Sequence, residues 1–183
     1  MSDNLLDLRD RPYELLVELE SRLLKSRLDL AGTTVAQLWT GLGFRLGTRW
    51  MVAPREEVRE VIQIPPLTRV PGARPWLLGV ANVRGSLLPV CDLNHLVGGE
   101  TGTPARGSRV MVFNSDRIPA GFLVDEVAGY RQFTVNDQRP ELLDGIGAVR
   151  PHLLGAFAHE GQPWLAISLH RLTRSAAFRQ SGW

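Results

Sequence analysis

Short apolar runs separated by turn residues dominate the chain after residue 38. Leu42, Phe44 and Leu46 alternate with other residues, as in a strand with one buried face. The runs at 77–83 and 87–90 are continuous, rich in Val and Leu and bounded by Gly or Pro, which is typical of buried strands. Further strand-like runs occupy 50–53, 109–114, 118–124, 133–135, 153–158 and 164–168. The pattern predicts roughly eight to ten short strands.

No long helical pattern lies between these runs, so a parallel sheet built from strand–helix–strand units is disfavoured. Close turn spacing instead indicates an antiparallel barrel or a pair of barrels. One helical turn leading into a strand is expected over residues 56–64, and another helical turn over 93–97. The loop at 98–108, rich in Gly, Thr, Pro and Ser, is the best internal boundary.

Residues 10–30 form the one clearly helical pattern. Asp10 and Pro12 suit the start of a helix, and the leucines that follow recur at spacings of three and four (Leu15, Leu16, Leu19, Leu23 and Leu24). This stripe either packs on the following domain or docks on a partner helix or a second copy. At the other end, residues 173–183 are expected to form a frayed tail, with Trp183 exposed or in a contact.

Arg84 and Gly85 lie between the apolar runs at 77–83 and 87–90. The short break predicts a tight hairpin in which Gly85 takes a positive φ angle. Arg84 is then either an ordinary surface residue of the turn or the polar tip of a contact site.

Composition places further limits on function. The chain has 183 residues, 44% of them hydrophobic and 22% charged, which suits one domain with a core or two small lobes. No apolar run approaches the ~20 residues of a membrane span, and the first residues do not form a secretory signal. A single cysteine, Cys91, excludes an internal disulfide and favours a cytoplasmic protein. The net charge is +2 and the arginines are scattered, unlike the basic stripe of nucleic-acid binders.

A search for catalytic groups finds no consistent set. The histidines (His95, His152, His159 and His170) lack metal-ligand spacing, and no nucleophile elbow or P-loop occurs. Gly41 and Gly43 lie inside a strand pattern, where no phosphate cradle is expected. Cys91 is expected to be a small buried residue and Asp92 to cap the next helical turn. Asp125 and Glu126 are adjacent, so a strand would point them to opposite faces. We therefore expect no enzyme, cofactor or metal, and a function by surface contact.

Six motifs in order carry a resemblance to a known family. They are Leu42-Gly-Phe-Arg-Leu-Gly47, Glu57-Val-Arg-Glu-Val61, Thr68-Arg-Val-Pro71, Leu78-Gly-Val-Ala-Asn-Val-Arg-Gly85, Leu88-Pro-Val-Cys-Asp-Leu93 and Gly121-Phe-Leu-Val-Asp-Glu-Val127. Together they resemble the CheW-like adaptor family of bacterial chemosensory systems, over residues 39–174. Three blocks together resemble in particular the PilI-type branch, which serves type IV pilus twitching motility. They are the N-terminal helix with Pro12-Tyr-Glu-Leu-Leu16, Gly43-Phe-Arg-Leu-Gly47 and Pro75-Trp-Leu-Leu-Gly-Val-Ala-Asn-Val-Arg-Gly85.

The resemblance implies a mainly β fold of two five-stranded, SH3-like barrels that share an apolar core, with an N-terminal helix and a short C-terminal helix. The expected division is a helical extension at 1–36, the CheW-like domain at 37–174 and a tail at 175–183. It further implies a cytoplasmic, non-catalytic scaffold at membrane-associated receptor arrays. The partners would be the tip of a methyl-accepting, PilJ-like chemoreceptor and the CheW-like domain of a CheA-type or ChpA-type histidine kinase.

The resemblance also assigns receptor-binding residues. The family's turn arginine falls on Arg84, and its Val-x-Glu motif falls on Val58 and Glu60. The positions after the hairpin fall on Leu87 and Leu88. A bidentate pair from Glu60 would orient Arg84 and leave an apolar groove between the barrels for a receptor helix. Alternatively, the pair only pins two strands together.

Two other functions remain open at this stage. The chain could serve a flagellar chemotaxis system instead of a pilus system. Small β-barrels also bind nucleic acid, and Trp39, Trp50 and Trp76 would then be stacking platforms for bases.

Overall fold

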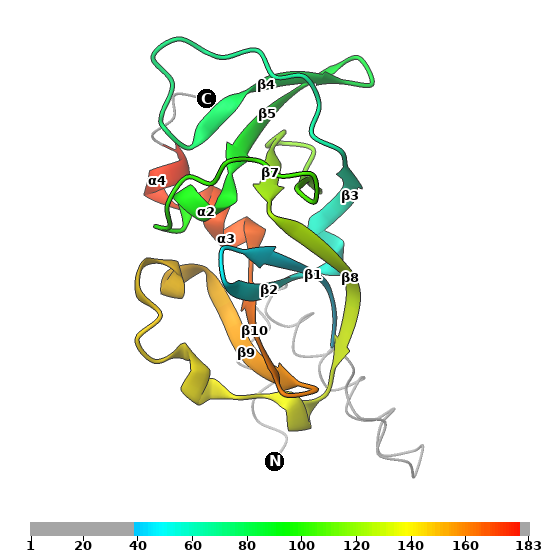
Figure 1. The fold of residues 1–183 in the computed structure, drawn as a ribbon, viewed down its shortest axis with the longest axis vertical. Coiled ribbons are helices and arrows are strands. Elements are labelled where there is room, and N and C mark those ends of the chain that lie inside the picture. The colour runs from blue at the N-terminus through cyan, green and yellow to red at the C-terminus, as the bar shows by residue number, and fades with distance from the viewer. Residues whose placement is uncertain (1–38, 180–183) are drawn as a thin grey trace, which may run out of the picture. The chain divides into compact units, whose positions relative to one another are not determined.

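Two five-stranded sheets make up the part of the chain that the structure describes. The structure is a computed structural model that describes residues 39–179 (Figure 1). Contacts divide the chain into two units, Met1–Gln37 and Leu38–Trp183. The predicted helix at 10–30 and the predicted exposure of Trp183 lie outside residues 39–179, which the structure describes.

The first sheet has the order β8-β1-β2-β10-β9. Its strands are β1 (Trp39–Leu46), β2 (Arg49–Pro54), β8 (Glu126–Phe133), β9 (Leu153–His159) and β10 (Gln162–Ile167). The hairpins β1–β2 and β9–β10 follow the turns predicted from the sequence. The two hairpins meet through a parallel pairing of β2 with β10, at Met51↔Leu165 and Val52↔Ala166.

The second sheet has the order β3-β6-β7-β5-β4. Its strands are β3 (Val58–Ile62), β4 (Leu77–Val83), β5 (Ser86–Asp92), β6 (Arg109–Phe113) and β7 (Gly121–Val124). Here β5 pairs with β7 in parallel. The expectation of purely antiparallel sheets is thus wrong at one pairing in each sheet, because two separate hairpins join side by side there. The pairings give two five-stranded sheets and do not close either into a ring.

Three local predictions need correction. The strand expected at 133–135 is the end of the longer strand β8, and residues 135–137 form a 3-10 turn instead. Most of β8 is exposed or half-buried, so it lacked the apolar alternation that marks a strand. The strand expected at 118–124 begins only at Gly121. The loop at 98–108 joins α2 (Leu93–Leu96) to β6 within the second sheet and is no boundary between the sheets.

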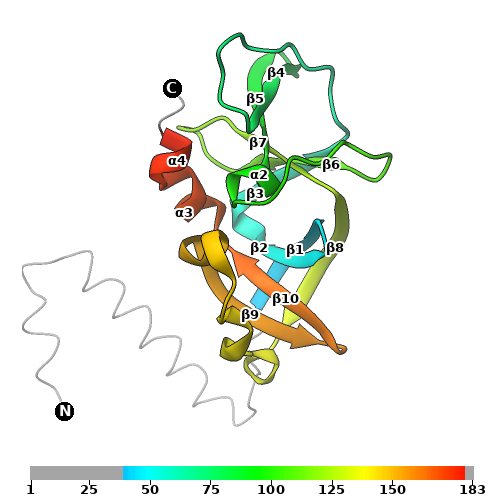
Figure 2. The ribbon, with the colours of Figure 1, turned by 60° about the vertical axis from the view of Figure 1, so that its left-hand side comes forward.

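Short 3-10 turns fill the polar stretch before β9. They are η2 (Val135–Asp137), η3 (Pro140–Leu143) and η4 (Gly147–His152). Arg139 donates its backbone N–H to Ala156 of β9 at 2.9 Å, and Gln138 bridges to Phe157. This stretch runs along β9 in Figure 2 and covers an edge of the first sheet that would otherwise expose unpaired backbone groups.

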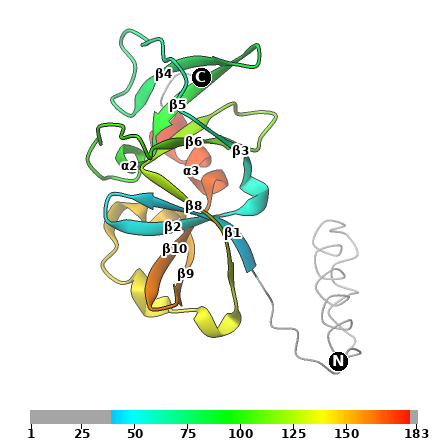
Figure 3. The same ribbon diagram turned by 45° about the vertical axis from the view of Figure 1, so that its right-hand side comes forward.

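The shared core lies between the two sheets, where Figure 3 shows helix α3 (Leu169–Arg174). One buried cluster combines side chains of both sheets, including Leu42, Phe44, Met111 and Phe122, with Leu169 of α3. Each sheet also has a smaller cluster of its own. That of the first contains Val52, Phe133, Phe157, Trp164 and Ala166, and that of the second Ala81, Val90, Val110 and Leu123.

The chain crosses between the sheets through very short connections. After β2, the single 3-10 turn η1 (Arg55–Glu57) leads directly into β3, which agrees with the predicted helical turn before a strand. After β7, only Asp125 separates the second sheet from β8 of the first. The Asp125 carboxylate accepts the N–H of Gly47 at 2.6 Å, and its own N–H donates to Arg45 at 3.1 Å. The crossing at Asp125 is therefore held by hydrogen bonds to the backbone of Arg45 and Gly47.

Glu57 joins η1 to the start of α3. Its side chain is only 6% exposed. Its carboxylate accepts hydrogen bonds from the Ser168 hydroxyl at 2.8 Å and from the backbone N–H groups of Leu169 at 2.5 Å and His170 at 3.2 Å. These backbone groups lack partners within a helix, so the buried carboxylate satisfies them and anchors α3 between the sheets.

The helical C-terminal segment belongs to the core as far as it is described. Helix α4 (Ala176–Arg179) places Phe178 at 5% exposure, stacked on Trp76 with ring centroids 5.5 Å apart. The expectation of a frayed tail from residue 173 is thus wrong up to residue 179. Residues 176–179 are too few to show a periodic apolar pattern, and the burial of Phe178 depends on Trp76, which lies far away in the sequence.

Gly41 and Gly43 are required by packing. A Cβ on Gly43 would lie 2.9 Å from the Trp164 ring, and one on Gly41 would lie 2.5 Å from Val52. Both glycines face the smaller cluster of the first sheet, whereas Leu42 between them faces the shared core. The glycines therefore make room for Trp164 and Val52.

Gly43→Ala is expected to destabilise the fold by about 1–3 kcal/mol, because the rigid Trp164 ring and the nearby backbone cannot yield to the added methyl group. Urea unfolding followed by tryptophan fluorescence measures this. Gly155→Ala in β9 is the matched control, since a Cβ there meets nothing within 4 Å. Equal stability of the two variants would contradict the packing role.

Glu57→Ala is expected to lower the free energy of unfolding by about 2–4 kcal/mol, since it leaves the buried donors at the start of α3 without an acceptor. Glu56→Ala is the control, because Glu56 is exposed and contributes only its backbone carbonyl. Denaturant midpoints of the two variants provide the comparison. A loss at Glu57 no larger than at Glu56 would show that the anchor does not matter.

Candidate functional site

The β4–β5 hairpin carries Arg84 on a two-residue turn. Val83 pairs with Ser86, and Arg84 and Gly85 between them have φ angles of 52° and 85°. Two consecutive positive φ angles are those of a type I′ turn, whose twist suits a hairpin. The Asn82 side chain accepts the Gly85 N–H at 2.9 Å and supports the turn. The predicted hairpin and the positive φ of Gly85 are confirmed.

Arg84 is an unfavourable residue for its place in this turn. Asn or Gly adopts a positive φ angle at lower cost than a long side chain does, and such strain in native structures concentrates at functional positions. The Arg84 side chain is 78% exposed, so core packing does not explain its choice. Glu160 in the β9–β10 turn has the same φ angle, so the exposure of the Arg84 guanidinium is the feature that sets this turn apart as a candidate contact.

Glu60 on β3 holds the guanidinium in place. Arg84 Nη2 donates to Glu60 Oε2 at 2.8 Å, which joins the β4–β5 turn to β3. The predicted pair forms, but through one contact instead of the expected two. Exposed ion pairs add little to stability. The contact consequently orients Arg84 and leaves its other nitrogens available to a partner.

A hollow of about 230 Å³ lies beside this pair and is called the hairpin hollow below. Its lining combines the ion pair with apolar and small residues: Arg59, Glu60, Val83, Arg84, Ser86, Leu87, Leu88, Val112, Phe113, Ser115, Pro119 and Ala120. All of these belong to the second sheet and its loops. The predicted groove between the two barrels is therefore misplaced for these residues, because β3 and the β4–β5 hairpin are the two edges of the same sheet.

Four of the five predicted contact residues line the hairpin hollow. Leu87 is 72% exposed, whereas Leu88 is buried against the sheet and contributes to the floor. Glu60 and Arg84 form the polar rim. Val58 is different, because it is 7% exposed within the shared core and absent from the lining. The predicted set of contact residues thus contains one core residue, Val58, and four residues that lie together around the hairpin hollow.

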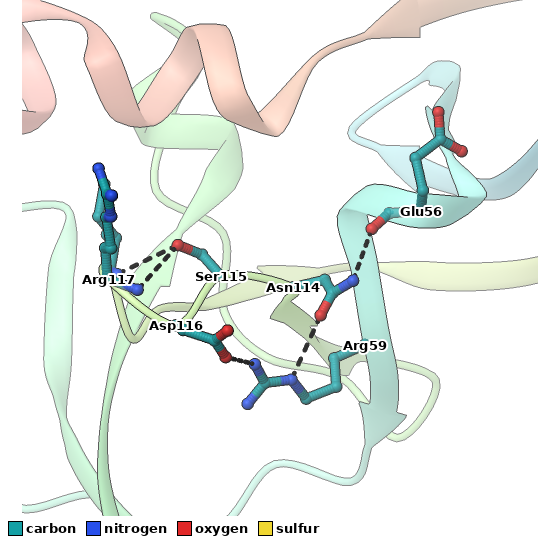
Figure 4. A network of polar contacts seen from close by, with 7 residues as sticks. Glu56, Arg59, Asn114, Ser115, Asp116 and Arg117 are labelled. Atoms are coloured by element: carbon teal, nitrogen blue, oxygen red, sulfur yellow. Dashed lines mark hydrogen bonds and ion pairs between the residues drawn. The ribbon is translucent and has the colours of Figure 1, made fainter.

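The loop between β6 and β7 forms the opposite wall, and residue patterns did not indicate it. Arg59 donates to Asp116 at 3.0 Å and to Asn114 at 3.5 Å, and Asn114 donates to the Glu56 carbonyl at 2.8 Å (Figure 4). These contacts tie the loop to η1 and β3. In the sequence, residues 114–117 indicate only a turn, since contacts across more than 50 positions leave no local signal.

Cys91 and Asp92 have the structural roles expected of them. Cys91 is 1% exposed, and burial together with the neighbouring Asp92 charge raises the pKa of its thiol to about 12. Asp92 caps α2 by accepting the His95 N–H at 3.1 Å. A buried, protonated thiol is a poor nucleophile.

No metal-binding group of three or more His, Cys, Asp or Glu side chains occurs within residues 39–179. No helix in the same range is long and apolar enough to cross a membrane.

The tryptophans considered as stacking platforms pack within the protein. Trp39 stacks on Phe157 at 5.3 Å, Trp50 lies 5.3 Å from Trp164, and Trp76 stacks on Phe178. Their faces are engaged by other rings.

Comparison with known proteins agrees with this picture. A family model described as the CheW-like domain matches residues 40–177. Protein PilI of Pseudomonas aeruginosa is 40% identical over 168 residues, covering 91% of this chain and 94% of that protein. Protein FrzA of Myxococcus xanthus is 36% identical over 119 residues, covering 64% of this chain and 73% of that protein.

Solved structures show the same fold. The crystal structure of the scaffolding protein TtCheW from Thermoanaerobacter tengcongensis superposes with a TM-score of 0.66, covering 76% of this chain and 94% of that chain. Its sequence is 21% identical, so this likeness concerns the fold alone.

Cys91 is expected to resist thiol reagents at pH 8. With a pKa of about 12, its thiolate fraction there is on the order of a thousandfold below that of a free cysteine. Labelling by a chromogenic disulfide measures the rate. The same protein in concentrated guanidinium chloride is the control and is expected to react fully. Rapid labelling of the native protein would contradict the burial of the β5 end.

Proposed function

The chain belongs to the CheW-like family of non-catalytic chemosensory scaffold adaptors, and we propose that it couples a methyl-accepting chemoreceptor to a CheA-type histidine kinase. The geometry of the hairpin hollow carries the receptor half of this proposal. An exposed Leu87 stands beside an oriented guanidinium, next to an apolar floor. Apolar grooves with a few polar groups at the rim suit an amphipathic helix of a partner.

The pathway that we propose is type IV pilus twitching motility. The similarity to PilI spans nearly the whole length of both chains. By comparison, chemotaxis protein CheW of Rhizobium meliloti is 28% identical over 70% of this chain. The partners are then a PilJ-like receptor and a ChpA-type kinase, and the adaptor works in the cytoplasm at receptor arrays. A flagellar chemotaxis system is the second candidate, favoured by the several relatives named CheW.

Within this proposal, the CheW-like domain at 37–174 consists of two SH3-like units, each curled around its own small cluster. The helical extension at 1–36 and the tail at 175–183 are additions to it. Contact residues for the receptor are Arg84, Glu60, Leu87 and Leu88, whereas Val58 supports them from the core. Nucleic-acid binding has no observation in its favour, since the tryptophan faces contact other rings.

A pulldown from native lysate with the full chain identifies the partners. Recovery of a pilus-system receptor together with its kinase is the expected result. Recovery of a flagellar receptor and kinase would replace the pathway while keeping the adaptor role. Recovery of neither, with a folded bait, would overturn the adaptor role itself.

Arg84→Glu is expected to weaken binding of the receptor domain identified in this way by about tenfold or more, which corresponds to about 1.4 kcal/mol. Repulsion from Glu60 and loss of the guanidinium both contribute. Calorimetric titration with the purified receptor domain measures the affinity, and a melting curve checks the fold.

Two matched variants separate a contact from a turn effect. Arg84→Asn suits the left-handed turn and is expected to keep or raise stability while binding more weakly. Arg49→Glu makes the same charge reversal at an exposed position of the first sheet and is expected to bind normally. Wild-type affinity of both Arg84 variants would show that the ion pair with Glu60 serves only to pin the strands.

A further inference from the structure

A second hollow adjoins the hairpin hollow. It measures about 380 Å³ and is called the arginine hollow below. Its floor is mostly apolar, and two arginines stand among its lining residues: Pro89, Cys91, Arg117, Ile118, Pro119, Thr173, Phe178 and Arg179. Pro119 of the β6–β7 loop lines both hollows, so the two hollows lie next to each other. A partner that fills the hairpin hollow thus has a second concave surface directly beyond Pro119.

The two arginines of this hollow differ from those of the hairpin hollow in their partners. Arg59 and Arg84 each contact a carboxylate, whereas Arg117 and Arg179 have no ion pair among residues 39–179. Figure 4 shows the Arg117 side chain extending from the loop towards the neighbouring helical segment. Ser115 holds the loop at this point, because its hydroxyl accepts the N–H groups of Arg117 at 3.3 Å and Ile118 at 3.2 Å. The hollow therefore presents positive charge that the described protein does not neutralise.

We propose that the arginine hollow is the second half of the receptor contact and takes an acidic side chain of the same receptor helix. This inference rests on the proposed function. Charge complementarity calls for an anionic group near Arg117 and Arg179, and the apolar floor calls for hydrophobic surface on the same ligand. An amphipathic helix with a carboxylate beyond its apolar stripe provides both. A small free anion would leave the floor uncovered.

In this proposal the two hollows make different kinds of contact with the receptor helix. The hairpin hollow supplies apolar contact through Leu87 and Leu88. The arginine hollow selects helices with an acid at the matching position, since a helix without it would bury two guanidinium groups unpaired. Charges at such a rim act on salt dependence and partner choice more than on total affinity.

The test uses the full chain and the receptor domain identified by the pulldown. Arg117→Glu combined with Arg179→Glu is expected to weaken binding about tenfold and to flatten the dependence of affinity on salt, while the melting temperature stays unchanged. Arg106→Glu made together with Arg49→Glu is the control, with the same change in net charge at exposed positions outside both hollows. Reversing one acidic residue of the receptor helix to Arg is expected to restore binding to the double Glu variant.

Other outcomes would overturn the inference, and they differ from a failure of the proposed function. If the double Glu variant binds the receptor normally while Arg84→Glu binds it more weakly, the arginine hollow is not part of the receptor contact. The adaptor role is then unaffected. A loss confined to binding of the kinase domain would assign the hollow to the kinase. A change in sedimentation of the free protein would assign it to a second copy. Failure of the wild type to bind any receptor would instead remove the proposed function.

Discussion

The buried Glu57 carboxylate connects the parts of this fold that must stay together. It sits in the 3-10 turn η1, one of the two places where the chain crosses between the sheets, and it accepts three hydrogen bonds at the start of α3. That helix contributes Leu169 and Leu172 to the core shared by both sheets. A charged group is buried at a cost, which is offset only when several donors converge on it. This well-satisfied carboxylate therefore acts together with the shared apolar core in holding the two sheets.

The candidate site depends on the same junction. The residue after Glu57 begins β3, whose Glu60 orients Arg84 on the opposite edge of the second sheet. Asn114 donates its side-chain amide to the Glu56 carbonyl and its backbone N–H to the Glu57 carbonyl, which brings the β6–β7 loop to the same place. The hairpin hollow is thus formed by a strand start, a strained turn and a loop, and the arginine hollow continues it along α4. A scaffold that works by contact needs such rigid, preformed surfaces more than it needs reactive groups.

Residue patterns were informative where local chemistry decides the structure. The β4–β5 hairpin, the cap at Asp92, the burial of Cys91 and the turn before β3 all depend on neighbouring residues and were predicted correctly. The exposed strand β8 was mostly missed, because its stability comes from backbone pairing with β1 and not from apolar alternation. The need for glycine at 41 and 43 is not visible in the sequence, because it comes from Val52 packed against Gly41 and the Trp164 ring packed against Gly43.

The sequence by itself determined the β-rich class, the short turns and the family resemblance, since these depend on short-range spacing or on ordered motifs. The pairing of Glu60 with Arg84 was a hypothesis that followed from the resemblance, and it forms through one contact. Only the tertiary structure decided where those residues lie. In the tertiary structure, strands of separate hairpins pair in parallel, and the hairpin hollow lies within one sheet. Val58 is buried, and Arg117 and Arg179 line the same hollow. Contacts between residues far apart in the chain follow from how whole sheets pack. No local pattern of residues encodes that packing, so the surface for a partner emerges only after the fold is formed.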